Sequence, residues 1–144
     1  MNKVIFSSRS CEWETPQWLF DNLDEEFHFT IDVAADHDNR KCVRYYTAED
    51  DGLSKSWKGE TVWLNPPYGL EAKKWVKKAY EESQRHGITV VVLVPARTDT
   101  ALFHDYVLGK GEIRFIRGRL HYSNSKNPAA FPSMIVVYRG DTNG

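Results

Sequence analysis

The sequence is short of cysteine, of long apolar runs and of any excess charge. Only Cys11 and Cys42 are present, and no signal-peptide pattern precedes them, so we expect a reduced, cytoplasmic protein rather than one stapled by disulfides. No apolar run approaches membrane-spanning length, which predicts no membrane partner. The 19 basic and 20 acidic residues give a net charge of -1. That balance argues against a strongly basic nucleic-acid binder, although a near-neutral total can hide a basic face.

The chain also has no internal repeat, low-complexity tract or linker, so its 144 residues predict one domain. Strand patterns of period two alternate with helix patterns, which predicts an α/β fold of three layers. Helices are expected from Thr15-Pro16 to about Glu26, with Thr15 as N-cap and Pro16 at the first helical position. Further helices are expected from Ala72 to Gly87, and from a cap at Thr98 or Asp99 to about Leu108. Strands are expected at residues 27–33, 44–47, 61–64, 88–94, 113–116 and 134–138.

Two of these elements have especially clear patterns. The second helix has one apolar face, and its other face carries lysines together with Glu81 and Glu82, which we expect to face water. Residues 88–94 are almost all apolar and β-branched, which is typical of a parallel strand buried on both faces.

The most informative stretch is Asn65-Pro66-Pro67-Tyr68-Gly69, between an apolar strand and the second helix. Two prolines fix the backbone and remove two donors, so Asn65 is held at the carboxyl end of its strand, where open α/β sheets place ligands. The Asn65 Oδ1 and the Pro66 carbonyl can accept both hydrogens of an exocyclic amine, while the Tyr68 ring stacks on the attached base. The alternative is a proline-stiffened connection with a solvent-facing Asn.

The Asn-Pro-Pro-Tyr motif resembles the catalytic motif of the S-adenosylmethionine-dependent amino-methyltransferases. Further segments, from about Trp13 to Tyr138, resemble the small phage-type DNA N6-adenine methyltransferases. These are Trp13-Glu14-Thr15-Pro16, residues 29–35, residues 49–53, residues 95–100 and Gly118-Arg119-Leu120. The resemblance implies a compact, partly truncated Rossmann-like α/β/α fold, with a mostly parallel sheet and an antiparallel last strand. It implies transfer of a methyl group from S-adenosylmethionine to the N6 amine of a flipped adenine, with Asn65, Pro66, Pro67 and Tyr68 as catalytic residues.

The resemblance also implies where S-adenosylmethionine binds. Asp32, at the tip of the first strand, would accept from the ammonium group, and a solvated loop Asp is the alternative. Asp36 or Asn39 would lie near the ribose. The remaining cofactor residues it implies are Thr15, Pro16, Ala34, Asp50 or Asp51, Leu53 and Asn65. Larger methyltransferases have a Gly-rich turn where this chain has Val33-Ala34-Ala35, which leaves open which backbone groups touch the cofactor.

DNA contacts are expected mainly from the segment between the last two strands. Residues 117–133 form a polar insert of basic and aromatic residues, long enough to read DNA, although a plain surface hairpin is an equal alternative. Together with Tyr68, the residues expected to bind DNA are Arg97, Arg117, Arg119, Tyr122 and Lys126. The polar 36–42 segment fits no metal-ligand spacing, so no metal is expected.

Two other functions share some of these features. Asn-Pro-Pro-Tyr also serves methyltransferases of RNA bases or of protein glutamine, and a glutamine enzyme needs no basic insert. A chain of another class, a non-catalytic DNA-binding or anti-restriction module, would have lost cofactor binding, against which the pairing of Asp32 with the Asn65 motif argues. We expect a monomer or weak homodimer.

Overall fold

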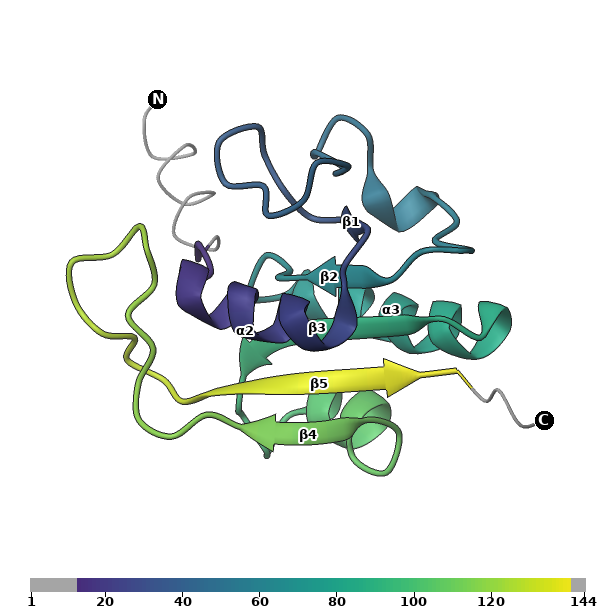
Figure 1. Ribbon diagram of the computed structural model, residues 1–144. Coiled ribbons are helices and arrows are strands. Elements are labelled where there is room, and N and C mark those ends of the chain that lie inside the picture. Colours follow the sequence, from purple (N-terminus) through teal and green to yellow (C-terminus); the bar gives the residue numbers. More distant parts are fainter. Residues whose placement is uncertain (1–12, 141–144) are drawn as a thin grey trace.

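The protein, as a computed structural model, is described over residues 13–140, so Cys11 lies outside the described residues. Its sheet contains β1 (Ile31–Asp32), β2 (Val62–Leu64), β3 (Thr89–Pro95), β4 (Glu112–Phe115) and β5 (Ser133–Arg139), in the order β1-β2-β3-β5-β4. The first three strands are parallel, and β5 lies antiparallel between β3 and β4 (Figure 1). The parallel start and the antiparallel last strand confirm the prediction.

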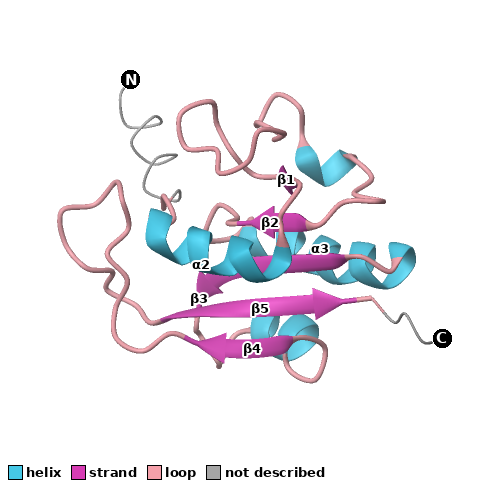
Figure 2. Cartoon of the chain, viewed as in Figure 1, coloured by secondary structure: helices cyan, strands magenta, loops and turns pink. Residues whose placement is uncertain are grey.

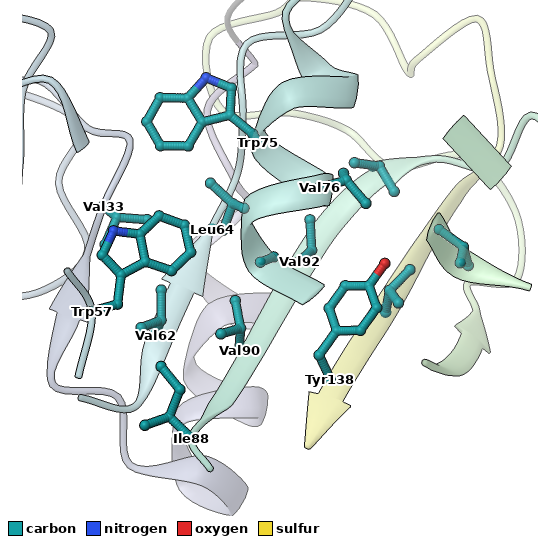
Figure 3. Packing of buried hydrophobic residues seen from close by; sticks show 14 of the residues in the cluster. Val33, Trp57, Val62, Leu64, Trp75, Val76, Ile88, Val90, Val92 and Tyr138 are labelled. Carbon is teal, nitrogen blue, oxygen red and sulfur yellow. The ribbon is translucent and has the colours of Figure 1, made fainter. Parts of the chain in front are cut away.

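Helices cover both faces of this sheet (Figure 2). Helix α2 (Gln17–Phe27) packs on one face, and α3 (Ala72–His86) with the short helix η2 (Phe103–Val107) packs on the other. The side chains of β3 alternate between the two cores, so the strand is buried on both sides as predicted. On the α3 side the Trp57 and Trp75 rings stack with centroids 6.5 Å apart beside Val33, Val62 and Leu64 (Figure 3).

The start of α2 differs from the prediction. Pro16 occupies the N-cap position and Thr15 makes no capping bond; the Pro16 carbonyl instead accepts from the N–H groups of Leu19 and Phe20 at 3.1 and 3.2 Å. Because Pro16 is extended there, with ψ 134°, Thr15 lies outside the helix and its hydroxyl is available for a tertiary contact. The helix therefore begins one residue later than the sequence predicted.

The predicted strands at residues 27–33 and 44–47 are also shorter. Phe27 ends α2, and Asp24 then caps the helix, since its carbonyl accepts from the His28 N–H and its carboxylate from the Phe29 N–H, both at 2.8 Å. Of residues 27–33, only Ile31 and Asp32 form a strand, β1. Residues 44–47 contribute a single β-bridge, between Tyr45 and Asp32. Helix capping outcompetes the alternating pattern in this stretch.

The third predicted helix is short, and its cap is Thr100 rather than Thr98 or Asp99. The Thr100 hydroxyl accepts from the Phe103 N–H at 3.2 Å, and a brief helical turn then widens into η2. The sequence pattern does not distinguish three neighbouring residues that can each cap a helix.

Glu82 does not face water: its side chain is buried, and a carboxylate oxygen accepts from the Trp57 backbone N–H at 2.6 Å. Lys78 and Arg85 lie 3.7 Å from that carboxylate. Glu82 therefore ties α3 to the loop that carries Trp57.

We predict that Glu82→Ala lowers the free energy of unfolding by about 1–3 kcal/mol, because it leaves the buried Trp57 N–H without its acceptor. Glu81→Ala, on the exposed face of the same helix, is the matched control and should change stability by less than about 0.5 kcal/mol. Urea unfolding of both variants measures the difference. Equal effects would contradict the role assigned to Glu82.

Candidate active site

The chemically interesting residues meet at one edge of the sheet. Because β1, β2 and β3 are parallel, their carboxyl ends lie together, bringing Asp32, Asn65 and Arg97 to the same edge. The insert predicted at residues 117–133 follows β4 and reaches the first residue of β5, Ser133; it lies at this edge too, near the start of α2 (Figure 1).

A first cavity of about 270 Å³ opens above β1 and β2. It gathers most of the residues predicted to bind a cofactor: Thr15, Asp32, Ala34, Asp51, Leu53 and Asn65. Asn39, predicted as a ribose neighbour, lines it as well, whereas Asp36 is not among the lining residues. Its wall also includes residues that were assigned no role from the sequence: Trp13, Glu14, Lys41, Glu71 and Trp75. Trp13 and Glu14 belong to a segment that resembles the methyltransferase family, whereas the sequence pattern places Trp75 only on the apolar face of its helix.

Asp32 is the buried carboxylate of this cavity, only 3% exposed. Burial raises the pKa of its carboxyl from 3.8 to about 6, although the backbone N–H groups of Lys41 and Ala34 donate to it at 3.0 and 3.4 Å and oppose that rise. An ionised carboxylate desolvated in this way gains most from a cationic ligand, which supplies the counter-charge that water no longer provides.

The floor of the cavity is built without a Gly-rich turn. The N–H of Ala34 donates to Asp32 and that of Ala35 donates to the Tyr46 carbonyl at 2.9 Å, so both amides already have protein partners. A glycine does appear on the neighbouring loop: a Cβ on Gly52 would lie 2.4 Å from the Val33 carbonyl oxygen. Gly52 thus lets residues 47–53 close on the end of β1 as a cavity wall.

Asp50 and Pro16 are not among the residues that line the cavity. The Asp50 carboxylate accepts from the Thr47 N–H at 2.9 Å and from the Thr47 hydroxyl at 3.2 Å, which closes a turn. That turn points the next residue, Asp51, into the cavity wall in a left-handed conformation with φ 56°. Of the two alternatives left open by the sequence, only Asp51 lines the cavity.

The Asn65 carboxamide is oriented by two acceptors. Its Nδ2 donates to the Trp13 carbonyl and, at 3.0 Å, to the Thr15 hydroxyl. A carbonyl can only accept, so the amide orientation is fixed and Oδ1 points elsewhere. That Oδ1 is buried and has no hydrogen-bond partner among residues 13–140. Buried acceptors are almost always paired in native proteins, so this atom is a candidate ligand contact.

A second cavity, of about 670 Å³, lies beyond the motif and is mainly apolar. Its lining includes Trp13, Tyr68, Lys73, Arg97 and Phe131, and Trp13 lines both cavities. The Tyr68 and Phe131 rings meet edge to face at 5.8 Å, and the Arg97 guanidinium lies 5.6 Å from the Phe131 centroid. This cavity has the aromatic walls and cationic rim that suit a planar, anion-linked ligand.

Tyr68 is anchored rather than freely presented. It is 8% exposed, and its hydroxyl contacts the Tyr122 hydroxyl at 3.1 Å. Burial raises the pKa of Tyr68 well above its usual value and also raises the pKa of Tyr122, so both phenols stay protonated at neutral pH. Neither can act as a ready proton acceptor there.

The prediction that Tyr122 contacts DNA is corrected by its burial, since its ring is 0% exposed and its hydroxyl also contacts that of Ser133 at 3.0 Å. It packs the insert onto the motif instead. Arg117, Arg119 and Lys126 are exposed on the insert, as a DNA-facing role requires, but none lines either cavity.

The carboxyl edge of the sheet thus carries two cavities that share Trp13, and the oriented Asn65 carboxamide lines the first of them. The chain belongs to the DNA N-6-adenine-methyltransferase (Dam) family, whose pattern matches residues 5–140. No helix within residues 13–140 has the length and apolar character needed to cross a membrane.

Two phage relatives are similar over most of this chain, and a third relative is similar over less than half of it. A DNA N-6-adenine-methyltransferase of Escherichia phage T1 is 31% identical over 90% of the chain and 55% of its own length. One of Haemophilus phage HP1 is 32% identical over 88% of the chain and 77% of its own length. A putative methyltransferase of Escherichia coli, YfdM, is 39% identical over 40% of the chain and 70% of its own length. The chain thus spans about half of the phage T1 relative.

We predict that Asp32→Asn changes how stability depends on pH. Burial raises the pKa of Asp32 in the folded protein from 3.8 to about 6. The contribution of Asp32 to the free energy of unfolding is therefore fully present below pH 3.8, the pKa of the unfolded chain, and is lost as the pH rises through about 6. The neutral Asn side chain has no such pH dependence. The free energy of unfolding of Asp32→Asn relative to wild type should therefore rise by up to about 3 kcal/mol between pH 3.5 and 7.5. Urea unfolding across this range measures it; parallel profiles for the two proteins would show that Asp32 titrates normally.

Proposed function

We propose that this chain is a DNA adenine-N6 methyltransferase that uses S-adenosylmethionine. In this proposal the sheet with helices on both faces is a compact, three-layer Rossmann-like methyltransferase fold. The observation that carries it is the buried Oδ1 of Asn65, which has no partner among residues 13–140 and lines the same cavity as the Asp32 carboxylate. Family membership supports the same activity.

The first cavity has groups that fit S-adenosylmethionine. Asp32 offers a desolvated carboxylate to the ammonium group, and the Asp51 carboxylate and Leu53 side chain suit the adenosine part. Trp75 adds an aromatic wall on the α3 side. When bound, this cofactor supplies a sulfonium methyl group that a nitrogen lone pair can take by in-line attack.

The second cavity would receive the adenine. Because N6 is paired inside a duplex, the base must leave the stack, at a cost of roughly a few kcal/mol. Tyr68 and Phe131 offer apolar walls to the flipped base, and Arg97 lies at the same cavity, where it can bind phosphate. The exposed Arg117, Arg119 and Lys126 of the insert would bind the surrounding DNA backbone.

Asn65 would act from the first cavity, three residues before the Tyr68 that lines the second. Its Oδ1 accepts one hydrogen of the N6 amine and the Pro66 carbonyl accepts the other, which fixes the nitrogen lone pair toward the first cavity. The Asn side chain takes up no proton, so the proton lost from N6 during transfer leaves to water. Catalysis then rests on orientation and electrostatics rather than on a strong base.

The activity is tested by incubating the protein with S-adenosylmethionine carrying a labelled methyl group and with methylation-free DNA. Nucleoside mass spectrometry should find the label in N6-methyladenine. Label on RNA or on a glutamine side chain, with none on DNA, would reject DNA as substrate. Failure to bind S-adenosylmethionine in a calorimetric titration would favour the non-catalytic module.

We predict that Asn65→Ala lowers kcat at least about a hundredfold, a loss comparable with removal of one preorganised polar group at other reaction centres. Binding of S-adenosylmethionine should persist, because the rest of the first cavity is unchanged. Asn22→Ala, on the exposed side of α2, is the matched control and should retain full activity. Wild-type turnover in Asn65→Ala would rule out this role.

For Tyr68 we predict that Ala lowers DNA-dependent activity more than Phe does, because the ring, rather than the hydroxyl, forms the cavity wall. Phe keeps the ring but loses the hydrogen bond to Tyr122, so it should cost some stability. Steady-state kinetics on duplex DNA, compared with thermal unfolding, separates the two effects. Equal losses of activity in both variants would argue against stacking.

A further inference from the structure

The segment just before α2, residues 13–15, lines the first cavity together with Asn65. Thr15 is 2% exposed, and its hydroxyl accepts from Asn65 Nδ2 at 3.0 Å. The sequence resemblance instead implied a contact between Thr15 and the cofactor. One hydroxyl is therefore a candidate for two different tasks.

The bond to Asn65 has a directional consequence. Nδ2 carries two hydrogens, and Trp13 and Thr15 supply an acceptor for each. Without Thr15 the Trp13 carbonyl alone would hold the amide, and the carboxamide could tilt about that single bond. The direction of Oδ1 thus depends on the Thr15 hydroxyl.

Thr15 is itself held from the other side by the insert. The Ser123 N–H donates to the Glu14 carbonyl at 2.9 Å, and the Ser123 hydroxyl donates to the Thr15 carbonyl at 3.4 Å. The Glu14 N–H donates to Asn124 Oδ1 at 3.0 Å. The Trp13 ring packs against Tyr122 with centroids 5.5 Å apart. The insert, residues 13–15 and Asn65 form one connected unit.

We propose that Thr15 is a positioning residue that orients the Asn65 carboxamide, and that the insert holds Thr15 in place for this task. The kinetic part of this proposal rests on the proposed methyltransferase function, whereas the orientation of Asn65 does not. A positioning role requires the hydroxyl as acceptor but not the methyl group.

Thr15→Val keeps the shape and removes the acceptor, and Thr15→Ser keeps the acceptor. We expect Thr15→Val to lower kcat about tenfold, the effect of one hydrogen bond, while the Kd for S-adenosylmethionine stays within about twofold. Thr15→Ser should recover most of kcat. A weakened Kd with unchanged kcat would make Thr15 a cofactor contact instead, and equal loss in Val and Ser would show that the hydroxyl is not what matters.

An activity-free measurement separates this proposal from the proposed function. In ¹⁵N-labelled full-length protein, the Asn65 side-chain amide pair is identified as the pair missing from Asn65→Asp. In Thr15→Val we expect the chemical shifts of this amide pair to change and its hydrogens to exchange faster with water. In Thr15→Ser the chemical shifts should stay near their wild-type values. Unchanged chemical shifts and exchange of this pair in Thr15→Val would overturn the positioning role. Normal behaviour of this pair in a protein that transfers no methyl group would reject the methyltransferase alone.

Discussion

The fixed direction of one carboxamide is the constraint on which this site depends. Two prolines hold Asn65 at the end of β2, and the Trp13 carbonyl and Thr15 hydroxyl take up its Nδ2. Its other polar atom, Oδ1, is left buried and unpaired among the described residues. Leaving a buried acceptor unpaired costs free energy of the order of 1–3 kcal/mol, which a ligand donor returns on binding. The arrangement favours a ligand with an N–H at that point.

The two cavities suit different ligands because their lining residues differ in charge and polarity. The first contains a carboxylate that burial has made unusually basic, so a cation gains there. The second is mainly apolar and aromatic, with Arg97 and Lys73 among its lining residues, so in the proposed function a flat base attached to a phosphate backbone would gain there. A net charge of -1 does not oppose that proposal, because cationic side chains can gather at one cavity while the total stays near neutral.

Much of the fold was predictable because its main signals are local. Neighbouring residues alone predict β3 from its apolar run, α3 from its single apolar face, and the end of α3 from the glycine that caps it. Prediction failed where a residue has a partner far along the chain: Thr15 bonds to Asn65, and Glu82 bonds to Trp57. In both cases the side chain satisfies a tertiary hydrogen bond rather than the local role that its position suggests. No periodicity carries that information.

The sequence marked the residues that line the two cavities better than the residues that support them. Asn65, Asp32 and Tyr68 stand out because a motif or a strand end marks them, and all three line a cavity. Tyr122 was expected to contact DNA only because aromatic residues in a basic insert often stack on bases. In the structure its ring packs between Trp13 and Tyr68 and its hydroxyl meets that of Tyr68. The insert therefore has two kinds of residue. Buried Tyr122 contacts the motif and Ser123 bonds to the segment before α2, while Arg119 and Lys126 are exposed. If the exposed cations bind DNA as proposed, the element that binds DNA is also the one that holds Tyr68 and Thr15, so DNA binding and the geometry of Asn65 would share one structural element.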